Sequence, residues 1–378
     1  AAPIMDAIEG GFTALGEWVG ANMAPGILND LLVNGVLAGM GSVLVFLPQI
    51  TILFAFILLL EDSGYLPRAA FLLDNLMAKS GLSGRSFIPL LSSFACAVPA
   101  VMSARTINDP RERLVTIAVA PLLTCSARLP VYALIIAAVI PNRTVGGIFN
   151  LQGLTLFILY LAGILSAALA AYIMKRLARM KGNVQQFPLL MELPTFRTPN
   201  FKHIMTSLWD RVKAFLKRAG TIIFALAVVL WGLVSWPQPP AGATGAAIDY
   251  SLAGMLGHAI QPLFAPLGFT WEMCIAMIPG IAAREVVVAA LGTVYAVSAS
   301  SEDAVQNALI PIVHNNWGLP TAFAFLAWYV YAPMCAATLA VIKRETKSTK
   351  NMVMITGYLF LMAYFAAFVV YQITSRIM

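Results

Sequence analysis

Long apolar windows separated by short polar segments dominate the pattern of residues along the chain. A window of about 20 apolar residues is long enough to cross a hydrocarbon core of about 30 Å as an α-helix. The windows that predict such spans are residues 34–60, 114–140, 151–174, 219–236, 321–342 and 352–371. The pattern therefore predicts an all-α fold, a polytopic bundle of transmembrane helices.

Two further apolar stretches are interrupted in a way that a straight span is not. Residues 87–104 contain Pro89 and Pro99, and residues 271–297 contain Pro279 followed by a glycine and two charges. Proline inside a helix removes a backbone hydrogen bond and kinks or breaks it. We expect broken or re-entrant helices at both places, which transporters use to build substrate sites.

The basic residues set the expected orientation. Residues 175–218 hold ten Lys and Arg against two acidic residues, whereas 237–269 contain no Lys or Arg. Cytoplasmic loops carry the excess of positive charge, so the first segment is predicted to be cytoplasmic and the second external. The spans on either side of 87–104 can then both end at Arg-rich cytoplasmic linkers only if this stretch starts and finishes on the same side.

The same count of crossings shows that the second interrupted stretch, 271–297, cannot be a single full crossing by itself. It is expected to be re-entrant or paired with a neighbouring half-helix. The segments SARLPVYAL, from Ser126, and AAREVVVAAL, from Ala282, each place an Arg after small residues. They indicate a weak internal repeat, which is compatible with an inverted repeat of the two halves.

Composition supports a membrane protein over a nucleic-acid-binding one. Hydrophobic residues make up 60% of the 378 residues and charged residues 11%, against about 25% charged in soluble domains. The net charge of +7 is concentrated beside the apolar windows, which is the positive-inside pattern. No phosphate-binding GxxxxGKS or GxxxxGKT motif, Rossmann fingerprint or catalytic triad occurs, so no GTP site is predicted.

Three charged residues lie inside apolar windows, where a charge costs at least a few kcal/mol: Arg128, Arg284 and Glu285. They are expected to face protein or a water-filled path. The arginines fit either a structural charge pair or carbonyl groups released by nearby prolines, and Arg105, which closes the first interrupted stretch, joins this set. Glu285 is the better candidate for a metal ligand, because carboxylates suit hard and borderline divalent cations.

Cysteines supply the other candidate ligands. Cys96 and Cys125 lie at breaks in the first half, and Cys335 follows Pro333 and Met334; Cys274 lies outside any break. They are read as thiols because they lie in apolar stretches. Each could contact a metal in transit or act as a small hydrophobic residue.

Two carboxylates end the first span. Glu61 and Asp62 are expected either to form a solvated helix terminus or to provide an exit or docking site for a cation.

Six segments in the same order resemble the ferrous iron transport protein B (FeoB) family. They are FLPQITILFAFILLLEDSGYLPRAAFLLD, FIPLLSSFACAVPAVMSARTI, APLLTCSARLP, MELPTFRTPN, IPGIAAREVVVAALGTVY and YAPMCAATLAVIKRET. The resemblance implies uptake of Fe²⁺ across the bacterial inner membrane through two gate regions. By motif it assigns the path to Cys96 and Cys125, with Glu61 and Asp62 before the first gate, Glu285 in the second and Cys335 after it.

The resemblance also implies an organisation. Residues 1–33 would be an external interfacial helix, 34–174 the first gate half, 175–218 a basic cytoplasmic loop, and 219–378 the second gate half with the C-terminal spans. Members normally begin with a G domain, a helical domain and one span, so Ala1 is expected to lie just after that span. In this chain Ala95 and Ala97 flank the first gate cysteine, where many members have Gly and Asn.

The partners expected from this resemblance are membrane lipid, Fe²⁺ as substrate, a G domain in the full-length protein or in trans, and small accessory Feo proteins. A homo-oligomer is compatible with the sequence, and nucleic acid is not expected. The chain is predicted to be a transporter and not by itself an enzyme. Two alternatives stay open: a gate-domain carrier of an organic solute such as a nucleoside, and a membrane scaffold that recruits a GTPase through residues 175–218.

Overall fold

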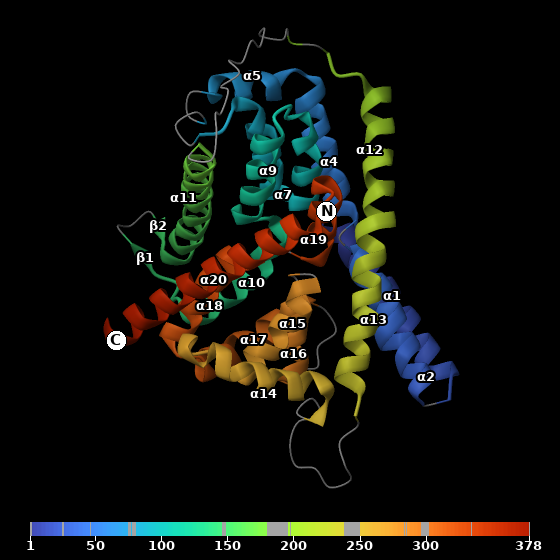
Figure 1. The fold of residues 1–378 in the computed structure, drawn as a ribbon. Coiled ribbons are helices and arrows are strands. Elements are labelled where there is room, and N and C mark those ends of the chain that lie inside the picture. Colours follow the sequence, from blue (N-terminus) through green and yellow to red (C-terminus); the bar gives the residue numbers. More distant parts are fainter. Residues whose placement is uncertain are drawn as a thin grey trace. The chain divides into compact units, whose positions relative to one another are not determined.

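The computed structural model describes most of the chain as helix (Figure 1). The described residues are 2–24, 26–45, 47–74, 77, 81–145, 149–179, 196, 198–237, 250–282, 284, 286–295, 302–333 and 335–377. Within them, the only extended pairing is a two-residue antiparallel ladder between β1 (Thr144–Val145) and β2 (Phe149–Asn150). The predicted all-α class is confirmed.

The chain folds as two compact units. Unit 1 comprises residues 1–55, 205–321 and 335–337, and unit 2 comprises 56–204, 322–334 and 338–378. The helices α4 (Leu47–Asp62), α12 (Phe201–Phe215) and α18 (Leu319–Tyr331) run from one unit into the other along the chain. The remaining elements of unit 1 are α1 (Ala2–Asn22), α2 (Ile27–Asp30), η1 (Leu31–Leu37), α3 (Ala38–Val45), η6 (Leu216–Gly220), α13 (Thr221–Ser235), α14 (Leu252–Phe264), η8 (Ala265–Leu267), α15 (Trp271–Ala282), α16 (Val286–Val294) and α17 (Glu302–Asn316).

Unit 2 holds the first interrupted stretch and the C-terminal helices. Its remaining elements are α5 (Tyr65–Leu72), η2 (Gly84–Ser86), α7 (Phe87–Ala95), α8 (Ala97–Ser103), η3 (Ala104–Thr106), α9 (Pro110–Val119), η4 (Ala120–Leu122), η5 (Ser126–Arg128), α10 (Leu129–Val139), α11 (Leu151–Arg179), most of α19 (Ala336–Thr346) and α20 (Thr349–Ile377).

Among the residues that the structure describes, five helices are long and apolar enough to cross a membrane. They are Ile27–Asp62, Pro110–Val139, Leu151–Leu177, Leu319–Thr346 and Thr349–Ile377, and they correspond to five of the predicted windows. The sixth window, 219–236, is helical as α13 but is not one of these five. α20 shows the pattern expected in lipid, because it buries Leu359 and Ala363 on one face and exposes Leu361 and Phe365 on the other.

The start of the chain departs from the expected boundaries. α1 ends at Asn22, and residues 27–33 belong to the long helix that continues to Asp62. Pro48 lies within this long helix and does not end it. α12, at the end of the predicted basic loop 175–218, continues through the π-helical η6 directly into α13.

The first interrupted stretch is a helical hairpin whose two ends lie on one side. α7 and α8 pack against each other across the break at Cys96. Where the stretch begins, the Ser83 backbone N–H and the Ser86 hydroxyl both donate to Glu112 in the first turn of α9. Where it finishes, η3 is joined to that same turn by a short linker, so both ends of the hairpin meet the start of α9. The contacts therefore agree with the re-entrant course predicted from the count of crossings.

The second interrupted stretch packs against the neighbouring helix α14. The segments Leu252–Leu267 and Trp271–Ile281 together are apolar enough to span but are bent by 105°. Gly257 permits the close packing of α14 on α15, since a Cβ there would lie 2.3 Å from Ile275 Cγ1. Ala253, Ile275 and Val294 form a buried cluster that adds α16 to the pair. The bend fits either a broken span or a re-entrant loop, so both predicted arrangements of this stretch stay open.

Candidate functional site

Two breaks in unit 2 each carry a cysteine in extended backbone. Cys96 separates α7 from α8 with φ −157° and ψ 135°, and Cys125 separates η4 from η5 with φ −86° and ψ 163°. Both conformations leave the helical region, so local helical hydrogen bonding stops at each thiol. Cys96 is partly exposed and Cys125 is 7% exposed, and neither is in a disulfide.

The structure brings these two breaks together. The Ser126 hydroxyl, directly after Cys125, donates a 3.0 Å hydrogen bond to the carbonyl of Ala95, directly before Cys96. Phe94 stacks on Tyr160 of α11 with ring centroids 6.3 Å apart, which places the first break against that helix. Two thiols and the backbone groups of two broken helices are therefore gathered in one region.

Arg128 is fully buried beside the second break. Its Nη1 donates to the Val330 carbonyl at 2.8 Å and its Nη2 to the Pro121 carbonyl at 2.9 Å. Val330 lies in the last turn of α18, where carbonyls have no helical partner, and Pro121 lies in the short η4 turn. Of the two readings of this arginine, the contacts support the binding of released carbonyls.

α11 approaches the second break closely through a glycine. A Cβ at Gly163 would lie 3.0 Å from the Leu122 carbonyl and 3.4 Å from Thr124 Oγ1. The Thr124 hydroxyl is buried and makes no hydrogen bond to the described residues. Ser126, Tyr160 and Gly163 were not predicted as site residues. The only signal in the sequence was a run of small and polar residues, TCSA, inside an apolar window.

The other predicted residues lie at breaks of their own. Cys335 is partly buried just before α19, at the end of the break that follows α18. Arg284, between α15 and α16, is 3% exposed. Glu285 lies outside the described residues, so its role as a ligand stays a prediction.

Asp62 binds the start of α12. Its Oδ2 accepts from the backbone N–H of Asn200 at 2.6 Å, and its Oδ1 lies 3.6 Å from His203 Nδ1. Asn200 caps the same helix by accepting from the N–H of Lys202 at 3.1 Å. A carboxylate at a helix N-terminus is favoured by the helix dipole. Asp62 is thus held by protein contacts, while the neighbouring Glu61 is exposed.

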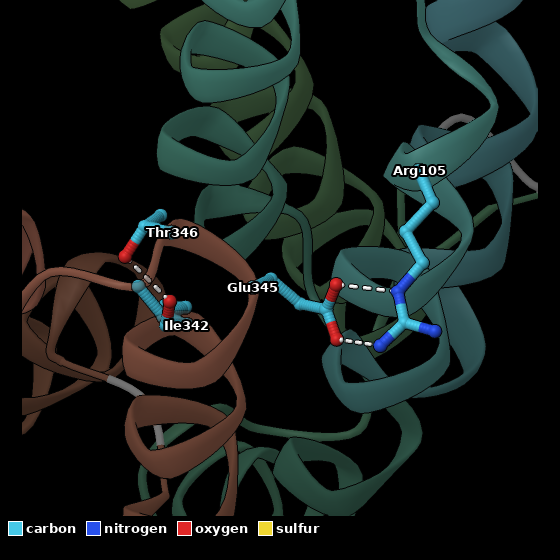
Figure 2. Close-up of polar contacts among 4 residues, drawn as sticks. All are labelled: Arg105, Ile342, Glu345 and Thr346. Atoms are coloured by element: carbon cyan, nitrogen blue, oxygen red, sulfur yellow. Dashed lines mark hydrogen bonds and ion pairs between the residues drawn. The ribbon is translucent and has the colours of Figure 1, made fainter.

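Arg105 forms a bidentate ion pair with Glu345 of α19, as Figure 2 shows. The Arg105 side chain is 55% exposed and the Glu345 side chain 7% exposed. The hydrogen bond to this carboxylate raises the pKa of Arg105 above its ordinary value. At the residue that follows Glu345, the Thr346 hydroxyl donates to the Ile342 carbonyl at 2.7 Å. The pair joins the end of the re-entrant hairpin to the end of α19.

The described residues hold no group of three or more His, Cys, Asp and Glu side chains arranged to hold a metal ion. The donors that the structure does bring together are the thiol-bearing breaks with their carbonyl groups. Such a set offers few, borderline-soft ligands, and an ion in transit needs ligands weak enough to leave.

Two family models match this chain. The family described as Gate, nucleoside recognition, matches residues 43–139 and 216–349. The family described as ferrous iron transport protein B C terminus matches residues 156–211. The chain is a polytopic membrane protein that belongs to the Gate family.

Its relatives are FeoB proteins, which confirms the resemblance seen in the sequence motifs. The chain is 41% identical over 98% of its length to the Fe(2+) transporter FeoB of Leptospira interrogans serogroup Icterohaemorrhagiae serovar copenhageni, and it covers 54% of that protein. It is 40% identical over 92% of its length to the Fe(2+) transporter FeoB of Staphylococcus aureus (strain COL), and covers 49% of it. The chain thus spans about half the length of these relatives. No solved structure matches it significantly.

Proposed function

We propose that this chain is the membrane permease part of a FeoB-type system that takes up Fe²⁺ across the bacterial inner membrane. The observation that carries the proposal is the identity of 41% over 98% of the chain with a protein named as an Fe(2+) transporter. The joined breaks at Cys96 and Cys125 support it, because they gather thiols where helical backbone is interrupted within the membrane-spanning region.

The proposed path uses a small set of donors in sequence. Cys96 and Cys125 contact Fe²⁺ at the joined breaks, Glu285 contacts it in the second gate half, and Cys335 after that. Glu61 is the more accessible of the two carboxylates at the end of α4, since Asp62 is engaged by α12. A ferrous ion suits this mixture of thiol, carbonyl and carboxylate, and weak ligands allow release.

The transport system needs more than this chain. We infer that a G domain acts with it, either as another part of the same protein or in trans, and that small accessory Feo proteins bind it. The chain itself moves an ion and performs no covalent chemistry. A homo-oligomer is compatible with this function.

The test is anaerobic uptake of ⁵⁵Fe²⁺ into proteoliposomes that hold the purified chain. Uptake is expected in the wild type and is expected to be lost in Cys96→Ser, Cys125→Ser and Glu285→Gln. Cys274→Ser is the matched control, because that thiol lies inside α15 and is buried. Uptake that persists in all three variants, or that falls equally in the control, would contradict the proposed path.

A carrier of an organic solute is the second candidate, because the matching Gate family is described by nucleoside recognition. Adding excess nucleoside to the uptake assay separates the two. Competition with ⁵⁵Fe²⁺ uptake, or nucleoside uptake without iron uptake, would favour the organic carrier. If no solute enters with this chain alone but ⁵⁵Fe²⁺ uptake appears once a G domain is supplied, the chain is a permease that requires that domain. If no solute enters in either case, the chain is a scaffold for a GTPase.

A further inference from the structure

Hydrogen bonds from one eight-residue segment in unit 2 connect three helix breaks. The segment runs from Pro121 to Arg128 and contains the break at Cys125. From it, Ser126 reaches the Ala95 carbonyl at the break of α7, and Arg128 reaches the Val330 carbonyl at the end of α18.

Each of these carbonyls is one that a helix leaves without a partner. Ala95 is the last residue of α7, and Val330 lies in the last turn of α18, before the break that begins at residue 332. In a membrane such groups have no water to bind, so they need a donor from the protein. The donors supplied here come from one short turn, whose geometry is closed by the backbone N–H of Arg128 donating to the Cys125 carbonyl at 3.1 Å.

The guanidinium is rigid, so its two bonds move together. Arg128 Nη1 and Nη2 hold Val330 and Pro121 at 2.8 and 2.9 Å, and the planar fork fixes the distance between those carbonyls. The side chain is fully buried, so no water replaces either bond. A displacement of α18 at this point therefore displaces the turn that carries Cys125.

We propose that Ser126 and Arg128 are positioning residues that couple the breaks at Cys96, at Cys125 and after α18, so that the three open and close as one unit. The proposal rests on the proposed function in one respect: if the breaks line the Fe²⁺ path, the path has one concerted gate in this unit. Neither residue contacts the ion in this account. They act by holding carbonyls.

The test is the rate at which each native thiol reacts with a small charged methanethiosulfonate reagent, followed peptide by peptide by mass spectrometry on the purified full chain. Ser126→Ala removes the bond to Ala95 while leaving Cys96 and its own helices unchanged. We expect the reaction rates of both Cys96 and Cys125 to rise by about two- to tenfold, the range that the loss of one net hydrogen bond gives in an opening equilibrium.

Arg128→Lys keeps the positive charge but removes the planar guanidinium that binds two carbonyls at once. It is expected to raise the reaction rates of Cys125 and of Cys335, which ends the break after α18. Ser126→Thr keeps the hydroxyl, so Cys96 and Cys125 should react at the wild-type rates in this variant.

Two controls separate coupling from general loosening. Ser92→Ala removes a hydroxyl from the same hairpin, but that hydroxyl donates to Ile88 one turn earlier in its own helix at 2.9 Å, so the thiol rates should not change. Cys274, inside α15 and 1% exposed, is the internal reference.

The proposal is overturned if Ser126→Ala changes Cys125 but not Cys96, or if every thiol including Cys274 becomes faster. Because the labelling needs no iron, coupled rates in a chain that fails to transport ⁵⁵Fe²⁺ would support the coupling and reject the proposed function. Uncoupled rates in a chain that does transport ⁵⁵Fe²⁺ would reject the coupling and support the proposed function.

Discussion

Charged side chains in unit 2 are stabilised in two ways at the scale of the residue. Arg128 is removed from water and is bound by carbonyl dipoles. Arg105 keeps most of its side chain in solvent while its partner Glu345 is largely buried. The desolvation cost of the second pair therefore falls on the carboxylate, because an ion that leaves water needs hydrogen bonds to replace it.

This asymmetry predicts unequal effects of removing the two partners. Glu345→Gln leaves Arg105 hydrated and should cost less than about 1 kcal/mol, as is usual for exposed pairs. Arg105→Gln leaves a largely buried carboxylate without its cation and should cost more, about 1–3 kcal/mol. Thermal unfolding of both variants in detergent checks the order. Equal losses of stability, or a larger loss for Glu345→Gln, would show that the desolvation cost does not fall mainly on the Glu345 carboxylate.

At the scale of the element, the α14–α15 hairpin depends on a position without a side chain. Gly257→Ala would place a methyl group 2.3 Å from Ile275 Cγ1 and 3.3 Å from the Trp271 carbonyl, so the two helices must move apart. We expect a net loss of stability, because overpacking costs about 1–3 kcal/mol and the gain in helix propensity is smaller.

The matched substitution is Gly232→Ala in α13, where no atom lies within 4 Å of the new Cβ. Alanine is the better helix former, so this variant should gain about 0.5–1 kcal/mol. Opposite shifts in the unfolding temperature of the two variants are the expected result. If both variants are stabilised, the hairpin adapts to the methyl group and its packing is not set by Gly257.

The elements themselves were largely predictable, because length and polarity dictate spans in a membrane. The helix breaks were also predictable, since Cys96 and Cys125 stand beside prolines and small polar residues. The contacts between breaks were not. Ser126 and Ala95 are 31 residues apart, and Arg128 and Val330 are 202 apart, distances over which a single sequence carries no pairing signal. For the same reason Asp62 was expected to meet solvent or a cation and not Asn200, 138 residues away.

At the scale of the whole molecule, the topology of the re-entrant hairpin can be tested by accessibility. Cysteines introduced as Arg85→Cys, before α7, and Thr106→Cys, after α8, should both react with an impermeant thiol reagent added on the cytoplasmic side of inverted vesicles. Thr144→Cys, in β1 after α10, is the reference for the external side and should react only in right-side-out cells. Reaction of residues 85 and 106 from opposite sides would make the stretch a full crossing.

The contact between Arg128 and Val330 also has a consequence for biosynthesis. The helix that contains Arg128 enters the membrane long before its carbonyl partner in α18 exists, because 202 residues remain to be translated between them. At about 5–20 residues per second the ribosome needs roughly 10–40 s to supply it. During that interval an unneutralised guanidinium sits in a nascent span. The newly made chain therefore depends on the insertion machinery, or on water retained around it, to shelter this residue until α18 arrives.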